Sequence, residues 1–440
     1  MGKAGKTRGK SSGGKGSSSN AVTYALVAAA AAVLCAVLAS GGGAGEEESV
    51  SATSGGGSGG GSGGRRLGFV PFAPPAGSAA GRGTAPASPG SPVAVSLHEN
   101  GDPAGTPHTF EDAAAFRRAA ARHRFYTAVG EPLRKHGQLR AGMAVYRVPA
   151  LKNPQGQWVQ HFIWPQRPVG DRVVVTGIDT PTRAPIELEA VKDSPRVFYV
   201  HNFLSGDEAD TLIARASDPT NPYSVRPSTT GHKSWTDDGG ASKANTNPTR
   251  TSENGFDIDS AAALAAKRRA FQLLRIEEYD ESMADGVQVL RYELGQAYIA
   301  HSDYFSTHTS ADHNWDPRKA GSNRFATVFL YLSDVEEGGQ TVFPRASPVL
   351  RGNETARPMP TAITEKLFPK GGWELELTKK CYSSLAITPK KGSAILFYSQ
   401  TPGGGLDPMS EHGACPILKG KKWAANMWVW NACRFGQCKK

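Results

Sequence analysis

The chain has 440 residues, enough for two or three domains, and a formal net charge of +10 that raises the question of a nucleic-acid partner. Half of that excess comes from five lysines and arginines before residue 21, with no acidic residue among them. Beyond that point basic and acidic residues are interspersed. No basic stripe interleaved with aromatic residues follows, so nucleic-acid binding is disfavoured.

The N-terminal 40 residues are predicted to be a membrane-targeting segment. A basic tail over 1–20 precedes residues 21–40, which are uncharged and would span about 30 Å as a helix, the thickness of a hydrocarbon core. Cations before this span and acids after it predict a single-pass type II signal-anchor, with the rest of the chain in the lumen of the endoplasmic reticulum or Golgi. The small residues 39–41 also suit a signal peptidase, so a cleaved signal peptide stays open.

Two regions without recognisable chemistry follow. Residues 41–106 are mostly Gly, Ser, Ala and Pro, and they predict a flexible, disordered linker because they bury too little surface to offset the entropy of ordering. Residues 107–192 predict an accessory region of unknown role. Within it, 110–126 favours a short helix capped by Thr109, and 171–178 favours a strand.

Residues 193–440 have the pattern of a larger, mainly β domain. Ser205 and Glu208 form a capping box that predicts a helix start, and a second helix is expected behind Asp259. Runs with period two then predict strands over 287–293, 297–305, 324–333, 340–344, 393–399 and 422–430. We therefore expect an α+β, mainly β fold, an antiparallel sandwich or double-stranded β-helix of the jelly-roll or cupin type, with helices against one side.

The cysteines agree with a lumenal domain. Apart from Cys35 in the apolar span there are four, Cys381, Cys415, Cys433 and Cys438, which suggests two disulfides with three possible pairings. The short loop between Cys433 and Cys438 could close on itself, which would leave Cys381 with Cys415 as a link between two strands. In such a compartment Asn353, in Asn-Glu-Thr, would also be a glycosylation acceptor.

A metal site is suggested by His301 and Asp303 in "GQAYIAHSDYF". In a strand these two residues point to the same face, and His412 in "SEHGACP" offers a third ligand. Two histidines and one carboxylate on one face of an octahedral ion leave positions open for a co-substrate and O₂, as in non-haem Fe(II) oxygenases. Taken singly, each histidine is more often an ordinary hydrogen-bonded residue.

Lys422 adds weight to the metal interpretation. It lies ten residues after His412, and on a strand that starts there Lys422, Asn426, Trp428 and Trp430 share one face. A lysine that faces an interior requires an anion. A dicarboxylate that chelates the iron at one end and reaches this ammonium group at the other would meet both needs.

Residues 195–431 resemble the catalytic domain of prolyl 4-hydroxylases, specifically the plant and algal peptidyl-proline enzymes. The matching motifs in chain order are RVFYVHNFLSGDEADTLI, RTSENGF, VLRYELGQAYIAHSDYF, RFATVFLYLSDVEEGGQTVFP, KKGSAILFYS and LDPMSEHGACPILKGKKWAANMW. The similarity covers about half of the chain, and it includes all three candidate ligands and the lysine.

The resemblance implies a role for each site residue. The catalytic residues would be His301, Asp303 and His412 as Fe(II) ligands, and Lys422 as the partner of the distal carboxylate of 2-oxoglutarate. Thr341 and Tyr292 would donate hydrogen bonds to that co-substrate. The residues implied for the peptide groove and its closing loop (250–256) are Tyr298, Arg324, Trp428, Arg250 and Ser252. Without the family context, strand packing or a solvated strand end would explain Thr341, Tyr292 and Arg324.

The implied activity is hydroxylation of peptidyl proline at C4 in proline-rich secreted or cell-wall proteins. Fe(II), 2-oxoglutarate and ascorbate would be the cofactors, O₂ would be consumed, and succinate and CO₂ would be released. The expected partners are the membrane and a peptide in the polyproline II conformation, whose ordering cost is small. The alternatives are the same chemistry on another peptidyl side chain and a catalytically inactive peptide-binding module; a nucleic-acid dioxygenase is disfavoured.

Two features depart from the family pattern. Members often carry histidine two residues after the position of Trp428, and here that residue is Trp430. We expect the apolar bulk to change how the peptide backbone is held. Residues 345–380 form a long polar connection, which is expected either to rim the groove or to be a surface loop.

Overall fold

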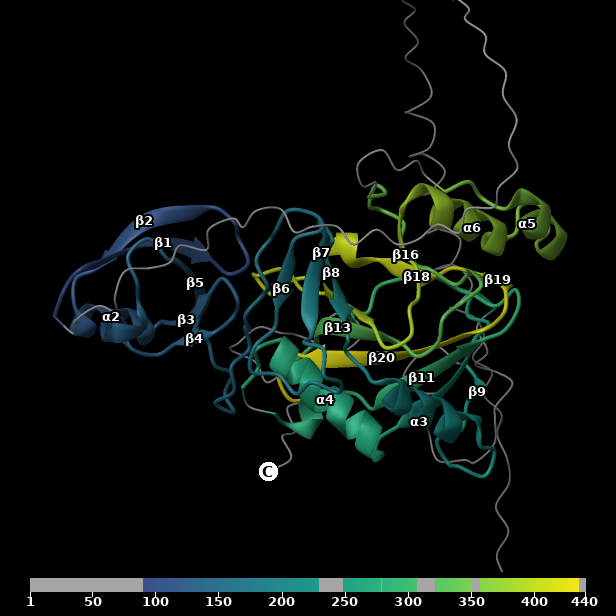
Figure 1. The fold of residues 1–440 in the computed structure, drawn as a ribbon, viewed down its shortest axis with the longest axis horizontal. Coiled ribbons are helices and arrows are strands. Elements are labelled where there is room, and N and C mark those ends of the chain that lie inside the picture. The colour runs from purple at the N-terminus through teal and green to yellow at the C-terminus, as the bar shows by residue number, and fades with distance from the viewer. Residues whose placement is uncertain (1–89, 229–247, 278, 307–320, 350–356, 435–440) are drawn as a thin grey trace, which may run out of the picture. The chain divides into compact units, whose positions relative to one another are not determined.

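The computed structural model describes residues 90–228, 248–277, 279–306, 321–349 and 357–434 (Figure 1). All described residues belong to a single unit of the chain, Ala76–Lys440. Across the described ranges no helix has both the length and the apolar character needed to cross a bilayer. The expected membrane span at 21–40 lies outside these ranges, as does Asn353.

A five-stranded sheet with the strand order β2-β1-β5-β3-β4 opens the described chain. We call it, together with its helix, the N-terminal module. Its elements are β1 (Val93–Glu99), β2 (Gly105–Phe110), α2 (Ala113–Ala120), β3 (His123–Thr127), β4 (Pro132–Leu133), η1 (His136–Gln138) and β5 (Ala144–Pro149). β1 runs antiparallel to β2 and parallel to β5. Phe116 of α2 packs with Val95, Phe110 and Phe125 in a small core.

The module corrects two sequence predictions. The linker expected over 41–106 is wrong for its last part, because β1 and β2 begin within it. Val93 and Val95 are buried and Ala94 between them is exposed, as in a strand with one buried face. Thr109 lies in β2 and does not cap the helix. The N-cap is Asp112, whose carboxylate accepts a hydrogen bond from the Ala115 amide at 2.7 Å. The helix is also shorter than predicted, since β3 begins at His123.

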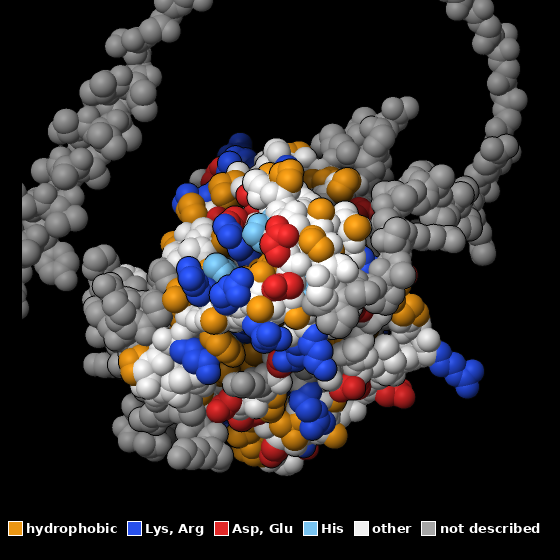
Figure 2. Space-filling view, turned by 90° about the vertical axis from the view of Figure 1, so that its left-hand side faces the viewer, with side chains coloured by type: hydrophobic (Ala, Val, Ile, Leu, Met, Phe, Trp, Pro, Cys, Tyr) orange, Lys and Arg blue, Asp and Glu red, His pale blue; other side chains and the backbone are white. Residues whose placement is uncertain are grey.

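Basic side chains gather on the side of the molecule that carries this module (Figure 2). Around α2 and η1, Arg117, Arg118, Arg122 and Lys135 are exposed. Acidic side chains lie among the basic ones in the same view, so the charges on this face are mixed.

The remaining strands form three further sheets. The nine-stranded sheet has the order β6-β7-β8-β17-β13-β20-β11-β10-β9, the four-stranded sheet β12-β18-β15-β16, and the pair β14-β19. The strands are β6 (Arg172–Val174), β7 (Glu187–Asp193), β8 (Arg196–His201), β9 (Arg226–Pro227), β10 (Glu253–Asp257), β11 (Val287–Tyr292), β12 (Tyr298–His301), β13 (Arg324–Tyr331), β14 (Glu337–Gly338), β15 (Thr341–Phe343), β16 (Leu385–Ile387), β17 (Ala394–Tyr398), β18 (His412–Ala414), β19 (Ile417–Lys419) and β20 (Lys422–Trp430).

Two hydrophobic layers flank the nine-stranded sheet. One face packs against the four-stranded sheet, where Phe329 and Phe397 meet Phe343 and Ile387. The other face carries the helices α3 (Gly206–Ser217) and α4 (Ala261–Leu273), with Leu212, Phe271 and residues such as Ala425 and Met427 in one cluster. Alternate residues of β20 therefore serve opposite faces, as period two requires. A mainly β fold with largely antiparallel sheets is confirmed. The expectation of helices on one side only is wrong, because α6 (Trp373–Ser383) packs against the four-stranded sheet, on the side opposite to α3 and α4.

The helices follow local sequence signals. They are α3 (Gly206–Ser217), α4 (Ala261–Leu273), α5 (Thr361–Leu367) and α6 (Trp373–Ser383), with the short turns η4 (Glu281–Met283) and η6 (Pro408–Ser410). The predicted capping box is present in α3, since Ser205 and Glu208 bond each other's backbone amides at 3.0 and 2.9 Å. Ser260 caps α4, one residue after the position expected.

Two further sequence predictions, one on the accessory region and one on a long connection, are wrong. Residues 107–192 are not one accessory region, because β6 and β7 join the nine-stranded sheet beside β8. The segment before β6 also belongs to the main core, where Phe162 and Trp164 pack with Tyr126 and Tyr146 of the module. The connection 345–380 holds α5 and most of α6 and is not simply a loop, since Leu375 and Leu377 bury an apolar face that its polar composition obscured.

Candidate functional site

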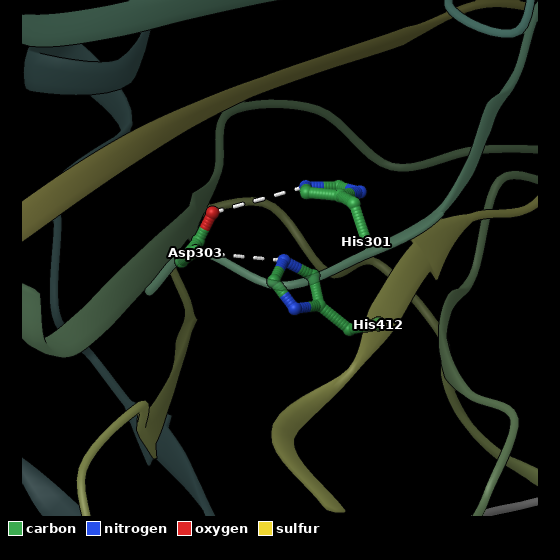
Figure 3. Close-up of side chains that lie close together, drawn as sticks. All are labelled: His301, Asp303 and His412. Carbon is green, nitrogen blue, oxygen red and sulfur yellow. Dashed lines mark ion pairs between the residues drawn. The ribbon is translucent and has the colours of Figure 1, made fainter. Parts of the chain in front are cut away.

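Three ionisable side chains converge between the four-stranded and the nine-stranded sheets (Figure 3). His301 is the last residue of β12 and His412 the first of β18, and the two are direct partners across the strands. Their Nε2 atoms lie 3.8 and 3.6 Å from the two carboxylate oxygens of Asp303. One donor atom from each residue falls within 4.8 Å of the others, which suits a single ion.

Asp303 reaches the cluster by a route that strand periodicity did not predict. β12 ends at His301, so Asp303 lies in a bend after the strand. The Thr327 hydroxyl on β13 donates to its Oδ2 at 2.7 Å and fixes its direction. Burial alone would raise the pKa of Asp303. The nearby His412, His301 and Arg324 outweigh burial and lower that pKa to about 2, so the carboxylate is charged.

Both histidines present a lone pair toward Asp303. His301 Nδ1 lies 2.9 Å from the carbonyl of Ile299, and His412 Nδ1 lies 3.0 Å from that of Ser410. A carbonyl only accepts, so Nδ1 carries the proton and Nε2 is free to bind a metal. Burial, with the neighbouring His412, lowers the pKa of His301 to about 3 and keeps the ring neutral. The donor set therefore fits a divalent cation such as Fe(II).

A small pocket, partly open to solvent, adjoins this cluster. Its lining is Leu290, Tyr292, Tyr298, His301, Phe329, Thr341, His412, Gly413, Ala414 and Asn426. Two residues that the sequence assigned to the co-substrate, Tyr292 and Thr341, are therefore on its wall. Burial raises the pKa of Tyr292 to about 12, so its hydroxyl keeps its proton and can donate.

Lys422 lies behind this wall, fully buried. Its ammonium group donates to the carbonyl of Gly339 at 2.7 Å and lies 5.5 Å from the ring centre of Tyr292 and 5.1 Å from that of Phe329. Among the described residues it has no acidic partner within ion-pair distance. Burial lowers its pKa to about 7. The site thus holds a buried cation at one end and a candidate metal centre at the other.

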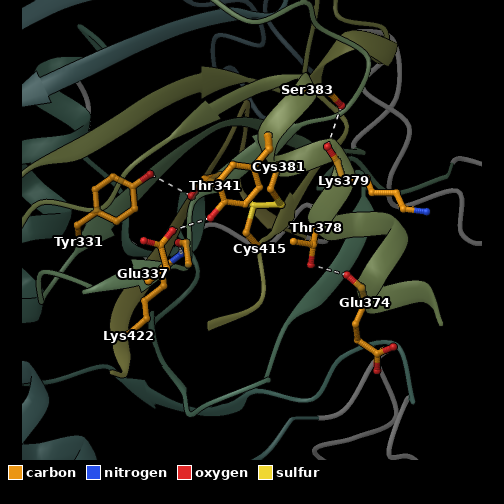
Figure 4. The surroundings of a disulfide bond; sticks show 12 residues. Tyr331, Glu337, Thr341, Glu374, Thr378, Lys379, Cys381, Ser383, Cys415 and Lys422 are labelled. Carbon is orange, nitrogen blue, oxygen red and sulfur yellow. Dashed lines mark hydrogen bonds between the residues drawn. A yellow bond between two sulfur atoms is a disulfide. The ribbon is translucent and has the colours of Figure 1, made fainter. Parts of the chain in front are cut away.

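Tyr331 lies behind the same wall, in contact with Thr341, and no sequence pattern had marked it. Its hydroxyl donates to Thr341 Oγ1 at 3.0 Å. Figure 4 shows this pair together with Lys422 around the disulfide. Tyr331 stands in "FLYLS", where period two alone cannot tell a core tyrosine from a site tyrosine.

Two arginine–aromatic stacks lie next to the metal cluster. The Arg324 guanidinium lies 3.6 Å from the ring centre of Trp428, and that of Arg250 lies 4.6 Å from Tyr298. Tyr298 in turn stacks on His301 at 3.8 Å between ring centres. Ser252 is buried and shares a hydrogen bond with Ser228. Of the five residues predicted to bind the peptide, Tyr298, Arg324 and Trp428 lie on β12, β13 and β20. The other two, Arg250 and Ser252, lie just before β10.

The predicted closing loop over 250–256 is wrong for its second half. Residues 253–257 form β10, which pairs with β11 along its whole length. Arg250 itself bridges Tyr298 across the backbone. This part of the motif therefore supports the site as a strand and does not form a free loop.

Trp430, which stands where family members often carry histidine, is buried. Its ring stacks on Phe305 at 5.6 Å, and its Nε1 donates to Asp285 at 3.1 Å. Asp285 also accepts from Arg324 and from Arg434. Asp285 stands in "MADGV", where no recognisable motif marks it as a site residue.

One predicted disulfide is confirmed. Cys381 and Cys415 are bonded, with a sequence separation of 34 residues (Figure 4). The bond joins α6 to the residue after β18, so the expected link between two strands is wrong. Cys433 is buried. Its predicted partner Cys438 lies outside the described residues, and that pairing stays a prediction.

The fold and the site together define a 2-oxoglutarate-dependent oxygenase. The family model described as the 2OG-Fe(II) oxygenase superfamily matches residues 287–430, a range that contains all three candidate ligands and Lys422. This match and the donor set agree that the cofactors are Fe(II) and 2-oxoglutarate.

The relatives narrow the class further. The chain is 35% identical over 245 residues to prolyl 4-hydroxylase 5 of Arabidopsis thaliana, which covers 55% of this chain and 70% of that protein. It is also 35% identical over 246 residues to probable prolyl 4-hydroxylase 10 of the same plant, covering 55% and 71%. The chain belongs to the prolyl 4-hydroxylase family.

A solved structure is also similar, at a lower level. The viral collagen prolyl hydroxylase of Paramecium bursaria Chlorella virus-1, in its 2-oxoglutarate complex, superimposes with a TM-score of 0.32 and 22% identity over 53% of this chain and 95% of that one. This score is too low to add to the family assignment.

Proposed function

We propose that the protein hydroxylates C4 of peptidyl proline in proline-rich polypeptides. One molecule each of O₂ and 2-oxoglutarate is consumed, one oxygen atom enters the C4–H bond, and the other enters the succinate that is released with CO₂. The observation that carries the proposal is the cluster of His301, Asp303 and His412 beside a pocket with a buried cation behind it. On this basis the sandwich is the double-stranded β-helix of such oxygenases.

The three clustered side chains would hold Fe(II). Bound iron supplies the O₂ and redox chemistry, and the protein supplies position and seclusion. The carbonyls of Ile299 and Ser410 keep both Nε2 atoms unprotonated, and Thr327 keeps the Asp303 carboxylate directed at them. These contacts preorganise the ligands before the metal binds.

The pocket would hold 2-oxoglutarate. Lys422 would pair with its distal carboxylate, which would give the buried ammonium group the anion that it lacks. The hydroxyls of Tyr292 and Thr341 would donate to the same carboxylate; the Tyr331 hydroxyl now donates to Thr341 and orients it. A co-substrate without a distal carboxylate, or one too short for that carboxylate to reach the ammonium group, would leave Lys422 without an anion.

The peptide would lie along the aromatic side chains next to the metal cluster. Tyr298 and Trp428 offer ring faces for pyrrolidine rings, and Arg250 and Arg324 offer donors for backbone carbonyls. A polyproline II peptide exposes its carbonyls without internal hydrogen bonds, so it suits such a surface. Ser252 lies under Arg250 and supports it.

Iron-dependent turnover of 2-oxoglutarate tests the proposal. It is measured with and without a poly(L-proline) peptide, for the wild type and for His412→Ala. We expect the peptide to stimulate turnover and the variant to lose at least about a hundredfold, since removal of a metal ligand removes the centre. Turnover that ignores the peptide would reject the substrate class, and turnover that survives the variant would reject the metal site. Dependence on ascorbate, which stays a prediction, is read in the same assay.

The location is a further part of the proposal. The Cys381–Cys415 disulfide supports an oxidising compartment, and residues 21–40 supply a candidate single-pass anchor in the endoplasmic reticulum or Golgi membrane with the catalytic part lumenal. Alkaline extraction of membranes and digestion with an endoglycosidase test both features. Release into the soluble fraction would indicate a cleaved signal, and an unchanged mass would argue against glycan at Asn353.

A further inference from the structure

Two buried asparagines connect the peptide side of the site to residues 157–164, the segment that follows the N-terminal module. We propose that Asn323 and Asn431 are positioning residues for peptide recognition, because they fix Phe305 and with it the stack around Arg324. The inference rests on the proposed function, since it concerns how the same site holds its peptide.

The side chain of Asn323 makes the backbone hydrogen bonds that a neighbouring strand would otherwise make. It has 0% exposure, its Oδ1 accepts from the amides of Phe305 and Arg324 at 3.0 and 2.9 Å, and its Nδ2 donates to the carbonyl of Phe305 at 2.9 Å. β12 has already ended at His301. A single amide side chain therefore binds both backbone polar groups of Phe305, which a strand partner would otherwise do.

Asn431 links Asn323 to the segment 157–164. It follows β20, has 0% exposure, and accepts from the Asn323 amide through Oδ1 at 2.8 Å. Its Nδ2 donates to the carbonyl of Val159 at 3.1 Å, and its own carbonyl accepts from His161 Nε2 at 2.7 Å. Both asparagine side chains use their amide oxygen and their amide nitrogen in this buried network, which favours one geometry.

The network ends at the stack beside the metal cluster. The ring of Phe305 lies 4.7 Å from the Arg324 guanidinium and 5.6 Å from the ring of Trp430. Arg324 Nη1 lies 3.9 Å from Oδ1 of Asp303. A small displacement of Phe305 therefore moves the guanidinium that faces both the peptide and an iron ligand. Even a small misplacement of a group that positions the substrate at a reacting centre lowers the rate of reaction strongly.

Asn100 provides a matched control. It is also a buried asparagine with two backbone bonds, to the carbonyl of His161 at 2.8 Å and from the amide of Ile163 at 2.9 Å. It holds the segment 157–164 from the side of the module, and neither of these hydrogen bonds involves Phe305. A purely structural role of buried asparagines predicts the same phenotype for all three positions.

The experiment compares Asn323→Ala, Asn431→Ala and Asn100→Ala in the full chain. It measures KM for a poly(L-proline) peptide, KM for 2-oxoglutarate, kcat and the unfolding midpoint. We expect peptide KM to rise about tenfold in the first two variants, with 2-oxoglutarate KM within about twofold of the wild type, because unsatisfied backbone groups shift Phe305 and not the pocket. Asn100→Ala should lower the midpoint and leave peptide KM unchanged.

The double variant Asn323→Ala/Asn431→Ala should raise peptide KM no further than the larger single effect, because both residues act through one network. Wild-type peptide KM in both single variants, or a parallel rise of both KM values in all three, would overturn the inference. If an alanine variant shows no 2-oxoglutarate turnover, the smaller change Asn323→Ser is used instead. A wild-type protein without iron-dependent 2-oxoglutarate turnover would reject the proposed function itself and not only this inference.

Discussion

Lys422 is the side chain that most directly reports which co-substrate the pocket takes. A buried ammonium group without an acidic neighbour is costly, and burial lowers its pKa to about 7. The groups that face it are the rings of Tyr292, Phe329 and Tyr331 and the carbonyl of Gly339, none of which supplies a full negative charge while the tyrosines keep their protons. The charge must then come from the ligand.

Binding of 2-oxoglutarate should therefore depend on pH. Below about 7 the ammonium group of the free protein is already charged, and above 7 binding must take up a proton. We expect the dissociation constant to rise up to about tenfold per pH unit above 7, which titration calorimetry with Fe(II)-loaded protein at several pH values measures. Lys422→Met should bind weakly at every pH, while the exposed neighbour Lys421→Met should match the wild type.

The lowered pKa of Lys422 also determines how the stability of the ligand-free protein changes with pH. Between about 7 and the usual lysine range, the unfolded chain binds a proton that the folded protein does not. The free energy of unfolding should therefore rise with pH in that window, and the rise should vanish in Lys422→Met. A flat profile in the wild type would show that the ammonium group is not desolvated.

Sequence patterns located some site residues at this scale and not others. His301, Asp303, His412 and Lys422 were found because each belongs to a short motif with metal or anion chemistry. Nothing in the local sequence marks Asp285, Tyr331 or Asn323, because their roles consist of contacts with distant segments.

At the scale of elements, the disulfide links a helix to a strand that carries a metal ligand. Cys415 comes three residues after His412, and its partner Cys381 lies on α6. Since the bond closes a loop of 34 residues, it should stabilise the fold by about 3–4 kcal/mol through the unfolded state.

The double variant Cys381→Ser/Cys415→Ser should lose about that free energy of unfolding and bind Fe(II) more weakly, because β18 loses its link to α6. Thermal unfolding and a metal titration measure the two effects. Ser383→Ala, on the exposed face of the same helix, should stay within about 0.5 kcal/mol of the wild type. Equal unfolding midpoints for both variants would contradict the stabilising role.

At the scale of the whole molecule, the segment before β6 closes the main core. Trp164 has 0% exposure, and its Nε1 donates to the carbonyl of Leu273 at 2.8 Å. Its cluster joins Tyr126 and Tyr146 of the N-terminal module to Phe271 of α4. The catalytic part therefore does not begin at residue 193, where the sequence analysis placed its start, but includes the segment before β6.

Trp164→Ala should destabilise the protein by about 3–5 kcal/mol, because it leaves a large cavity in this shared core. Chemical denaturation measures the change. Leu151→Ala, at a side chain with 41% exposure, should change stability by less than about 0.5 kcal/mol. A chain that starts at residue 194 should lose cooperative unfolding. If it unfolds like the full chain, the segment is dispensable.

Local patterns alone were sufficient for the capping box of α3 and for several strands of the nine-stranded sheet, such as β11, β13 and β20. They also suggested the metal ligands, and the resemblance of whole motifs to a family gave the site residues their roles. The physical basis of the local patterns is short-range: period two, caps and ligand types are properties of a few neighbouring residues. The tertiary structure decided the sheet order, the true extent of the catalytic part, the direction of Asp303 and the contacts of Trp430. Those depend on which distant segments pack together, and a single sequence does not encode that packing in any local pattern.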